Sequence, residues 1–159
     1  MKLFLYSIII FLLGPCHKPS ATANSAKEDY SKVNFSFQRT PCFGKCPAFT
    51  MDINGSTKTI TYKGRSNVDK IGTYTKAITD DEIAALVKAF DNAHFFEFND
   101  KYKGNMTDLP STFTSYTNGS KTRKIEDMNG APAELRELEK LLDTIANSDG
   151  WKKDETSDN

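Results

Sequence analysis

The sequence predicts an α+β domain: an antiparallel β-sheet built from hairpins, with two amphipathic helices packed on one face. Two patterns support this prediction. Segments in which hydrophobic and polar residues alternate come in pairs separated by turn residues, which is typical of hairpins. Two other segments repeat hydrophobic residues every three or four positions, as a helix buried on one side does. The order is strands, helix, strands, helix, so we expect both helices to cover one sheet.

A first strand and then a hairpin between residues 49 and 62 are expected at the start of the domain. Hydrophobic and polar residues alternate over residues 33–37 and again over residues 49–53, which predicts strands with one buried face. Residues 54–57 (NGST) supply a turn, and Ile60 and Tyr62 lie on the returning strand. A weaker strand is predicted from Lys70 to Thr75.

The first helix is expected to begin at Thr79. Thr79 and Glu82 have the spacing of a capping box, in which each side chain bonds the other residue's backbone N–H. The residues that follow at helical spacing form one hydrophobic stripe: Ile83, Leu86, Val87 and Phe90.

A second hairpin is expected across residues 112–126. Its turn is predicted at Asn118-Gly119, a strong hairpin signal. A two-residue loop pairs Thr112 with Ile125, and a three-residue loop pairs Phe113 with Ile125. The sequence leaves both registers open.

The second helix is predicted to follow Gly130-Ala131, with Pro132 in its first turn. Asp149-Gly150 ends it. Its expected buried stripe consists of Leu135, Leu138, Leu141, Leu142 and Ile145.

The first 15 residues predict a signal peptide. Lys2 precedes a hydrophobic run from Leu3 to Leu13, which is shorter than the roughly 20 residues of a membrane-spanning helix. Leu13–Cys16 resembles the lipobox of bacterial lipoproteins, although Pro15 stands where a small residue is usual. We therefore expect lipidation of Cys16 and attachment to a membrane, facing the periplasm or the cell surface. Cleavage after Ala23, giving a secreted protein without lipid, is the alternative.

The rest of the chain divides into a flexible tether (16–30), a single α+β domain (31–151) and a disordered tail (152–159). The chain has 21 basic and 21 acidic side chains, and loss of Lys2 leaves 20 basic ones. This balance gives no reason to expect a nucleic-acid partner.

Cys42 and Cys46 lie in the densest motif, TPCFGKCP, where Gly44 allows a sharp turn between the two thiols. In an exported protein they are expected to form a structural disulfide. Two alternatives stay open: a thiol-redox or metal-handling role, and unpaired or partner-linked thiols. The CxxxC spacing differs from the CxxC of redox sites at helix N-termini.

No catalytic constellation, metal site or cofactor motif is recognised. The polar loop from Asn99 to Ser111 is the candidate for binding a protein partner in the envelope. Its hydrophobic residues could equally fold back onto the core. The candidate binding residues are Asp100, Tyr102, Asp108, Leu109 and Pro110.

Three segments carry a family resemblance: Arg39–Pro47 (RTPCFGKCP), Thr107–Thr112 (TDLPST) and Gly130–Pro132 (GAP). With Glu134, Leu135, Leu138 and Trp151, they resemble a bacterial lipoprotein domain of unknown function, number 6438. The resemblance covers about residues 31–151 and implies an exported, often lipid-anchored α+β domain without assigned activity.

The expected function is therefore non-catalytic: a lipid-anchored envelope domain with a binding or structural role. The alternative is a thiol-redox or metal-handling protein that uses Cys42 and Cys46.

Overall fold

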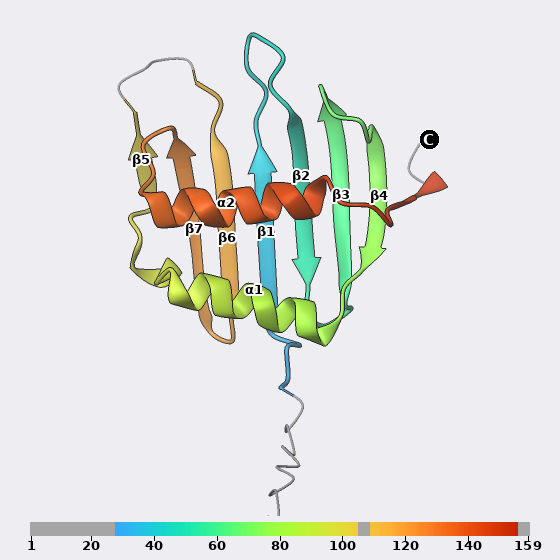
Figure 1. Cartoon of the computed structure of the whole chain (residues 1–159), viewed down its shortest axis with the longest axis vertical. Coiled ribbons are helices and arrows are strands. Elements are labelled where there is room, and N and C mark those ends of the chain that lie inside the picture. The colour runs from blue at the N-terminus through green and yellow to red at the C-terminus, as the bar shows by residue number, and fades with distance from the viewer. Residues whose placement is uncertain (1–27, 105–108, 156–159) are drawn as a thin grey trace, which may run out of the picture.

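The computed structural model describes residues 28–104 and 109–155. Eight strands form one sheet in the order β5-β7-β6-β1-β2-β3-β4-β8, and the helices α1 and α2 pack against it (Figure 1). The predicted α+β class is confirmed. The elements are β1 (Val33–Arg39), β2 (Ala48–Asn54), β3 (Thr59–Ser66), β4 (Gly72–Ala77), α1 (Asp80–Asn92), the 3-10 helix η1 (Phe95–Glu97), β5 (Lys101–Lys103), β6 (Thr112–Asn118), β7 (Lys121–Met128), α2 (Ala133–Ala146) and β8 (Lys152–Lys153).

The sheet is antiparallel except where β5 runs parallel to β7. β1 lies at its centre and pairs with β2 on one side and β6 on the other. The alternation predicted for β1 is confirmed, because Val33, Phe35 and Phe37 are buried and the residues between them are only partly buried. The predicted hairpin of β2 and β3 is also present.

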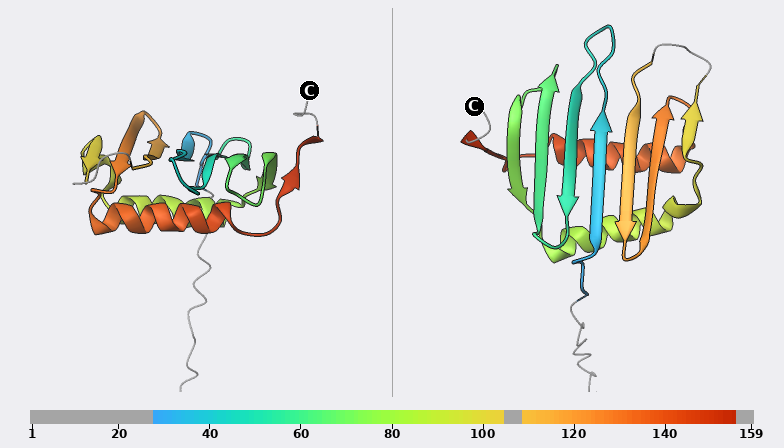
Figure 2. Two further views of the ribbon diagram at one scale, coloured as in Figure 1. Left: turned by 90° about the horizontal axis from the view of Figure 1, so that it is seen from above. Right: turned by 180° about the vertical axis from the view of Figure 1, so that it is seen from behind.

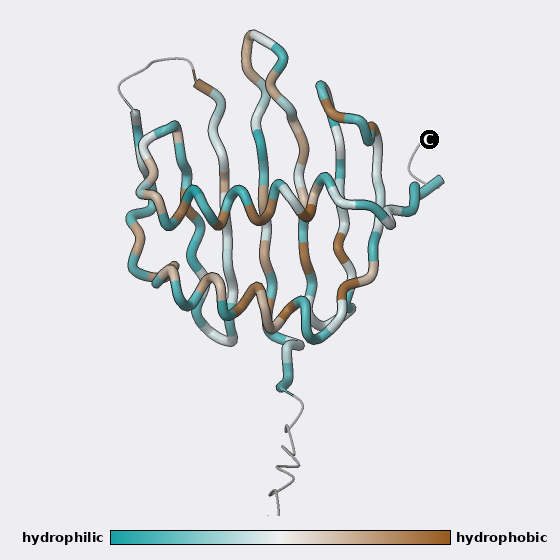
Figure 3. Tube along the Cα trace, in the orientation of Figure 1, coloured by the Kyte–Doolittle hydropathy of each residue, from teal (hydrophilic) through white to brown (hydrophobic). Residues whose placement is uncertain are grey.

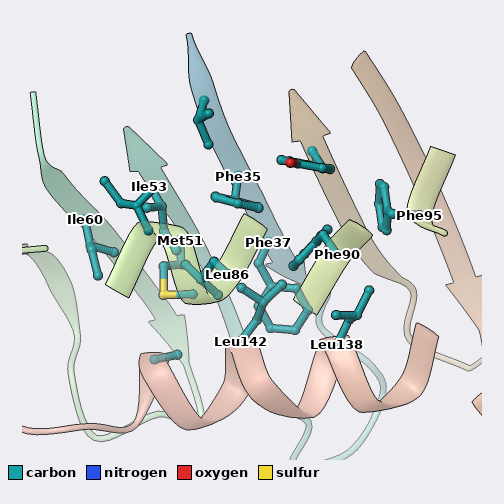
Figure 4. Packing of buried hydrophobic residues seen from close by; sticks show 14 of the residues in the cluster. Phe35, Phe37, Met51, Ile53, Ile60, Leu86, Phe90, Phe95, Leu138 and Leu142 are labelled. Carbon is teal, nitrogen blue, oxygen red and sulfur yellow. The ribbon is translucent and has the colours of Figure 1, made fainter. Parts of the chain in front are cut away.

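Both helices lie on the same side of the sheet when the molecule is seen from above (Figure 2). Hydrophobic positions recur along the helices and the central strands (Figure 3). Side chains from the two layers meet in one core, in which Phe37 and Met51 of the sheet lie near Leu86 of α1 and Leu142 of α2 (Figure 4). Burial of these hydrophobic residues is the main force that holds the layers together.

The predicted capping box of α1 is confirmed. The Thr79 Oγ1 accepts a hydrogen bond from the Glu82 N–H at 3.2 Å, and Glu82 Oε2 accepts one from the Thr79 N–H at 2.8 Å. Two N–H groups that have no partner within the helix are thereby satisfied.

Both predicted registers of the β6–β7 hairpin are wrong. Asn118 pairs with Lys121 and Thr114 with Ile125, so the two loop residues are Gly119 and Ser120. Gly119 has a φ of 63°, which glycine adopts without strain, and this moves the turn one residue further along the chain.

The stripe predicted for α2 needs a correction. Leu141 is exposed, and Glu139 is buried with Leu135, Leu138 and Leu142. Pro132 is the N-cap of α2 and does not lie in its first turn.

The ends of two other predicted segments also shift. β4 begins and ends two residues later than the strand predicted over 70–75. Lys152 and Lys153, predicted to be disordered, form β8 beside β4.

The described chain begins at Glu28, at the end of the sheet where α1 and the β6–β7 turn lie (Figure 1). The β1–β2 loop extends beyond the opposite end. Over the described residues, no helix has the length and hydrophobicity to cross a membrane.

Candidate functional site

A cleft of about 850 Å³ lies between α2 and the loops at the end of the sheet opposite Glu28. We call it the α2 cleft. The β1–β2 loop, the β3–β4 loop, the segment before β6 and one side of α2 form its walls. Its lining includes Arg39, Thr40, Cys46, Pro47, Phe49, Val68, Asp69, Leu109, Pro110, Thr112, Asp127, Arg136, Glu137, Glu139, Lys140 and Asp143.

The β1–β2 loop is closed by the predicted disulfide between Cys42 and Cys46, whose Cα atoms are 5.6 Å apart. Asn67 in the β3–β4 loop donates a hydrogen bond to the Cys46 carbonyl at 3.1 Å. On the other side, Ser111 N–H donates to Thr40 Oγ1 at 2.7 Å. These bonds hold the loop between its two neighbours at the rim of the cleft.

Asp127 of β7 is buried and shapes the turn that leads into α2. Its Oδ1 accepts hydrogen bonds from the N–H groups of Gly130 and Ala131, at 2.8 and 2.9 Å. A side chain at Gly130 would place its Cβ 2.6 Å from the carbonyl of Lys103, so only glycine fits there. The backbone at the start of α2 is thereby fixed against the sheet.

Arg39 joins the sheet to α2. Its guanidinium donates two hydrogen bonds to the carboxylate of Asp143, one of them from Nε at 3.2 Å. A third goes to the hydroxyl of Thr112 on β6. Such two-point pairs of arginine and carboxylate fix orientation as well as charge, so Arg39 and Asp143 satisfy one another.

Glu139 of α2 is a largely buried carboxyl in the wall of the cleft. It is 5% exposed, and no hydrogen bond to its carboxyl is found in the described part of the chain. Burial raises the pKa of Glu139 to about 7, and the negative charges of Asp127 and Asp143 act in the same direction. Arg39 and Arg136 partly oppose the shift. A carboxyl that titrates near neutral pH is typical of functional sites.

The residues predicted for the binding loop do not stay together. Leu109 and Pro110 line the cleft. Asp100 accepts a hydrogen bond from Arg123 at 2.8 Å, and the Tyr102 hydroxyl accepts one from the Asn99 N–H at 2.9 Å on the edge of the sheet. Asp108 lies outside the described residues, as does Cys16.

Glu139 and Asp127 were not predicted as site residues from the sequence. A signal for Glu139 was present, because at about 3.6 residues per turn it falls closer to the middle of the Leu135–Leu142 stripe than Leu141 does. No local signal marks Asp127, because its role depends on a turn three residues away. Within residues 28–104 and 109–155, no group of three or more His, Cys, Asp or Glu side chains is arranged to hold a metal ion.

The chain was compared with models of known protein families. Residues 33–146 match the model of the domain of unknown function DUF6438. The chain belongs to this family. A search of curated proteins finds no match. The matched range runs from the start of β1 to the end of α2 and contains every residue that lines the α2 cleft except Asn147.

Two of the three segments that carried the resemblance line this cleft, and the third is bonded to Asp127, which also lines it. The segment 39–47 forms its rim through the disulfide loop. The described part of the segment 107–112 supplies Leu109, Pro110 and Thr112. The segment 130–132 is held by Asp127 at the start of α2. Segments far apart in the sequence thus build one site.

Proposed function

We propose that this chain is an exported, lipid-anchored domain of the bacterial cell envelope, and that it binds a small ligand in the α2 cleft without transforming it. The observation that carries the proposal is the meeting of two resemblance segments, 39–47 and 107–112, at one cleft that also contains the largely buried carboxyl of Glu139 without a hydrogen bond from the described residues. A volume of about 850 Å³ is within the range of small-molecule sites.

The hydrogen bonds among the residues that line the cleft favour a binding role over a catalytic one. Arg39 and Asp143 hold one another, and Asp127 holds the backbone, so these groups fix the shape of the walls. Glu139 is then left as a carboxyl that a ligand can contact, within partly hydrophobic walls. A few well-placed polar groups in a hydrophobic cleft are typical of ligand-binding sites.

The test is a fragment screen on the mature chain, followed by the NMR chemical shifts of the backbone amides. We expect compounds that bind to shift the resonances of residues that line the cleft, and to be recovered chemically unchanged. Shifts confined to the opposite, open face of the sheet would contradict the proposed site, and turnover of a bound compound would contradict the binding role.

Two matched substitutions sharpen this test. Glu137→Trp places a large ring at the cleft, where the exposed Glu137 pairs with Lys140. Glu134→Trp makes the same change on an exposed part of α2 that does not line the cleft. We expect ligand binding to be lost in the first variant and kept in the second.

The anchor is a separate part of the proposal. The intact mass of the protein from its native membrane is expected to show cleavage before Cys16 and the added acyl chains, whereas a chain that begins after Ala23 would contradict lipidation.

The thiol-redox alternative for Cys42 and Cys46 stays a hypothesis of its own. A reduction potential below about −300 mV is expected of a structural bridge, and a value close to that of thioredoxin would favour redox work.

A further inference from the structure

We propose that the ligand of the α2 cleft is an organic cation, whose protonated amine or guanidinium contacts the carboxyl of Glu139. The inference rests on the proposed function, since it assigns a ligand class to the same cleft.

The Glu139 side chain is largely buried and has a free capacity to accept hydrogen bonds. It lines the cleft and is 95% buried, since only 5% is exposed, and it has no hydrogen bond or ion pair within the described residues. Among the described residues, the fully buried side-chain atoms without a partner are Thr114 Oγ1 and Trp151 Nε1, so the Glu139 oxygens are open to the cleft and a ligand can reach them. A donor on a ligand supplies the missing partner.

The neighbouring carboxylates differ from Glu139 in this respect. Asp143 is held by Arg39, and Asp127 accepts two backbone N–H groups. Neither needs a ligand to be satisfied. Glu139 is therefore the carboxyl at which a bound donor gains most.

Some of the charges on the cleft walls cancel in pairs. Arg39 cancels Asp143, and Lys140 cancels Glu137, with the Lys140 Nζ 3.1 Å from the Glu137 Oε1. The net charge of the cleft walls is therefore set by the remaining charged groups.

The remaining charged side chains on the lining are acidic in excess. They are Asp69, Asp127 and Glu139 against Arg136, whose guanidinium donates to the carbonyl of Ala131. A concave surface with this excess attracts positive ligands and repels anions.

The shape of the cleft indicates what else the ligand carries. Phe49, Val68, Leu109 and Pro110 give parts of the wall a hydrophobic surface. An amine attached to a compact hydrophobic body would cover this surface while its charge contacts Glu139. Benzylammonium is a suitable probe of this kind.

The binding should depend on pH because only the ionised carboxylate attracts a cation. The groups that face Glu139 are Asp127 from β7, Arg39 from β1, and Asp143 and Arg136 from α2, and burial among them raises the pKa of Glu139 to about 7. Affinity for the cation should rise as the pH increases through 7, with release of about half a proton per ligand bound at pH 7.

The experiment is a titration of the mature chain with benzylammonium, benzyl alcohol and phenylacetate, by calorimetry at pH 8 and by NMR. We expect benzylammonium to bind at least about tenfold more tightly than the other two. Glu139→Gln should weaken it by about tenfold or more, the range of a hydrogen bond to a charged group. Glu134→Gln is the matched control and should change the affinity by less than about threefold, because that side chain is exposed on the same helix and does not line the cleft.

The outcomes separate the two proposals. If benzyl alcohol or phenylacetate binds in the cleft as tightly as benzylammonium, or if Glu139→Gln keeps full affinity, the cation inference is overturned while the cleft remains the binding site. If every probe that binds shifts resonances outside the cleft, both proposals fail. If none of the three probes binds, the cation inference fails, and the fragment screen decides the proposed function.

Discussion

The two helices lie on the same side of one sheet, yet their buried faces differ in chemistry. The buried residues of α1 are all hydrophobic: Ile83, Leu86 and Phe90. Those of α2 include the carboxyl of Glu139 among leucines. The ends of the helices differ in the same way, since α1 begins with a full capping box and α2 begins at Pro132, which offers no side-chain cap.

This difference indicates which helix is specialised. α1 has a capping box at its start and one hydrophobic stripe against the sheet, so stability accounts for these features of its sequence. α2 departs from those rules where it borders the cleft, and such departures are expected at functional sites. Four predictions test this division between a structural and a functional helix, and they follow in order of expected effect.

The largest effect is expected from Phe90→Ala in α1. Phe90 is fully buried, with its ring 4.8 Å from that of Phe35 and 5.1 Å from that of Tyr116. The free energy of unfolding, measured with denaturant, should fall by about 3–5 kcal/mol. Phe90→Leu, which leaves a smaller cavity, should fold more stably than Phe90→Ala. A purely structural role for α1 also requires that the pKa of Glu139 stay unchanged in Phe90→Leu, and a shift would break the division.

The second prediction is a pH dependence that belongs to α2. The pKa of Glu139 is about 7 in the folded chain, against 4.5 as its ordinary value. Between these pH values the unfolded chain binds fewer protons than the folded one, so the free energy of unfolding falls as pH rises. The loss from this group should be on the order of 3 kcal/mol by pH 8.

Glu139→Gln removes this contribution. Relative to the wild type, the variant should gain stability between pH 4 and pH 8 by the amount that the wild type loses through Glu139. The measurement is the difference between their unfolding free energies at each pH. Parallel pH profiles for the two proteins would show that Glu139 does not titrate near neutral pH.

The third prediction concerns the rim of the cleft. Replacing Cys42 and Cys46 together with serine should lower the free energy of unfolding by about 2 kcal/mol, because the bridge no longer restricts the unfolded chain. Phe43→Ser at the fully exposed tip of the same loop is the control and should have little effect. Equal losses in both variants would mean that the loop, and not the bridge, provides the stability.

The smallest effect is expected at the start of α1. Thr79→Ala removes the hydroxyl that accepts from the Glu82 N–H and should cost about 1 kcal/mol in thermal or chemical unfolding. Thr79→Ser keeps the hydroxyl and should restore most of this loss. A neutral Thr79→Ala would show that packing alone holds α1.

Much of the fold could be predicted because its signals are local. The alternation in β1 and the box at Thr79 act within a few residues, and both were found in the structure. The turn at Gly119 shifted by one residue, because the pairing of β6 with β7 also depends on which of their side chains face the helices. β5 was missed, because its three residues gain their strand conformation only by pairing with β7.

The candidate site was harder to predict than the fold. Leu109 and Pro110 were found as loop residues, but their place at the cleft depends on α2, which is distant in the sequence. Glu139 looked like one more polar residue of a surface helix. Its burial follows only when Asp127 and Arg39 are brought beside it from other strands.

The direction of β1 has a consequence for what the protein can reach. The strand begins near Glu28 and ends at the cleft, and its seven residues span roughly 23 Å. With a lipid on Cys16, the attachment would enter the domain at the end opposite the cleft, so the anchor would leave the opening free for solutes of the compartment.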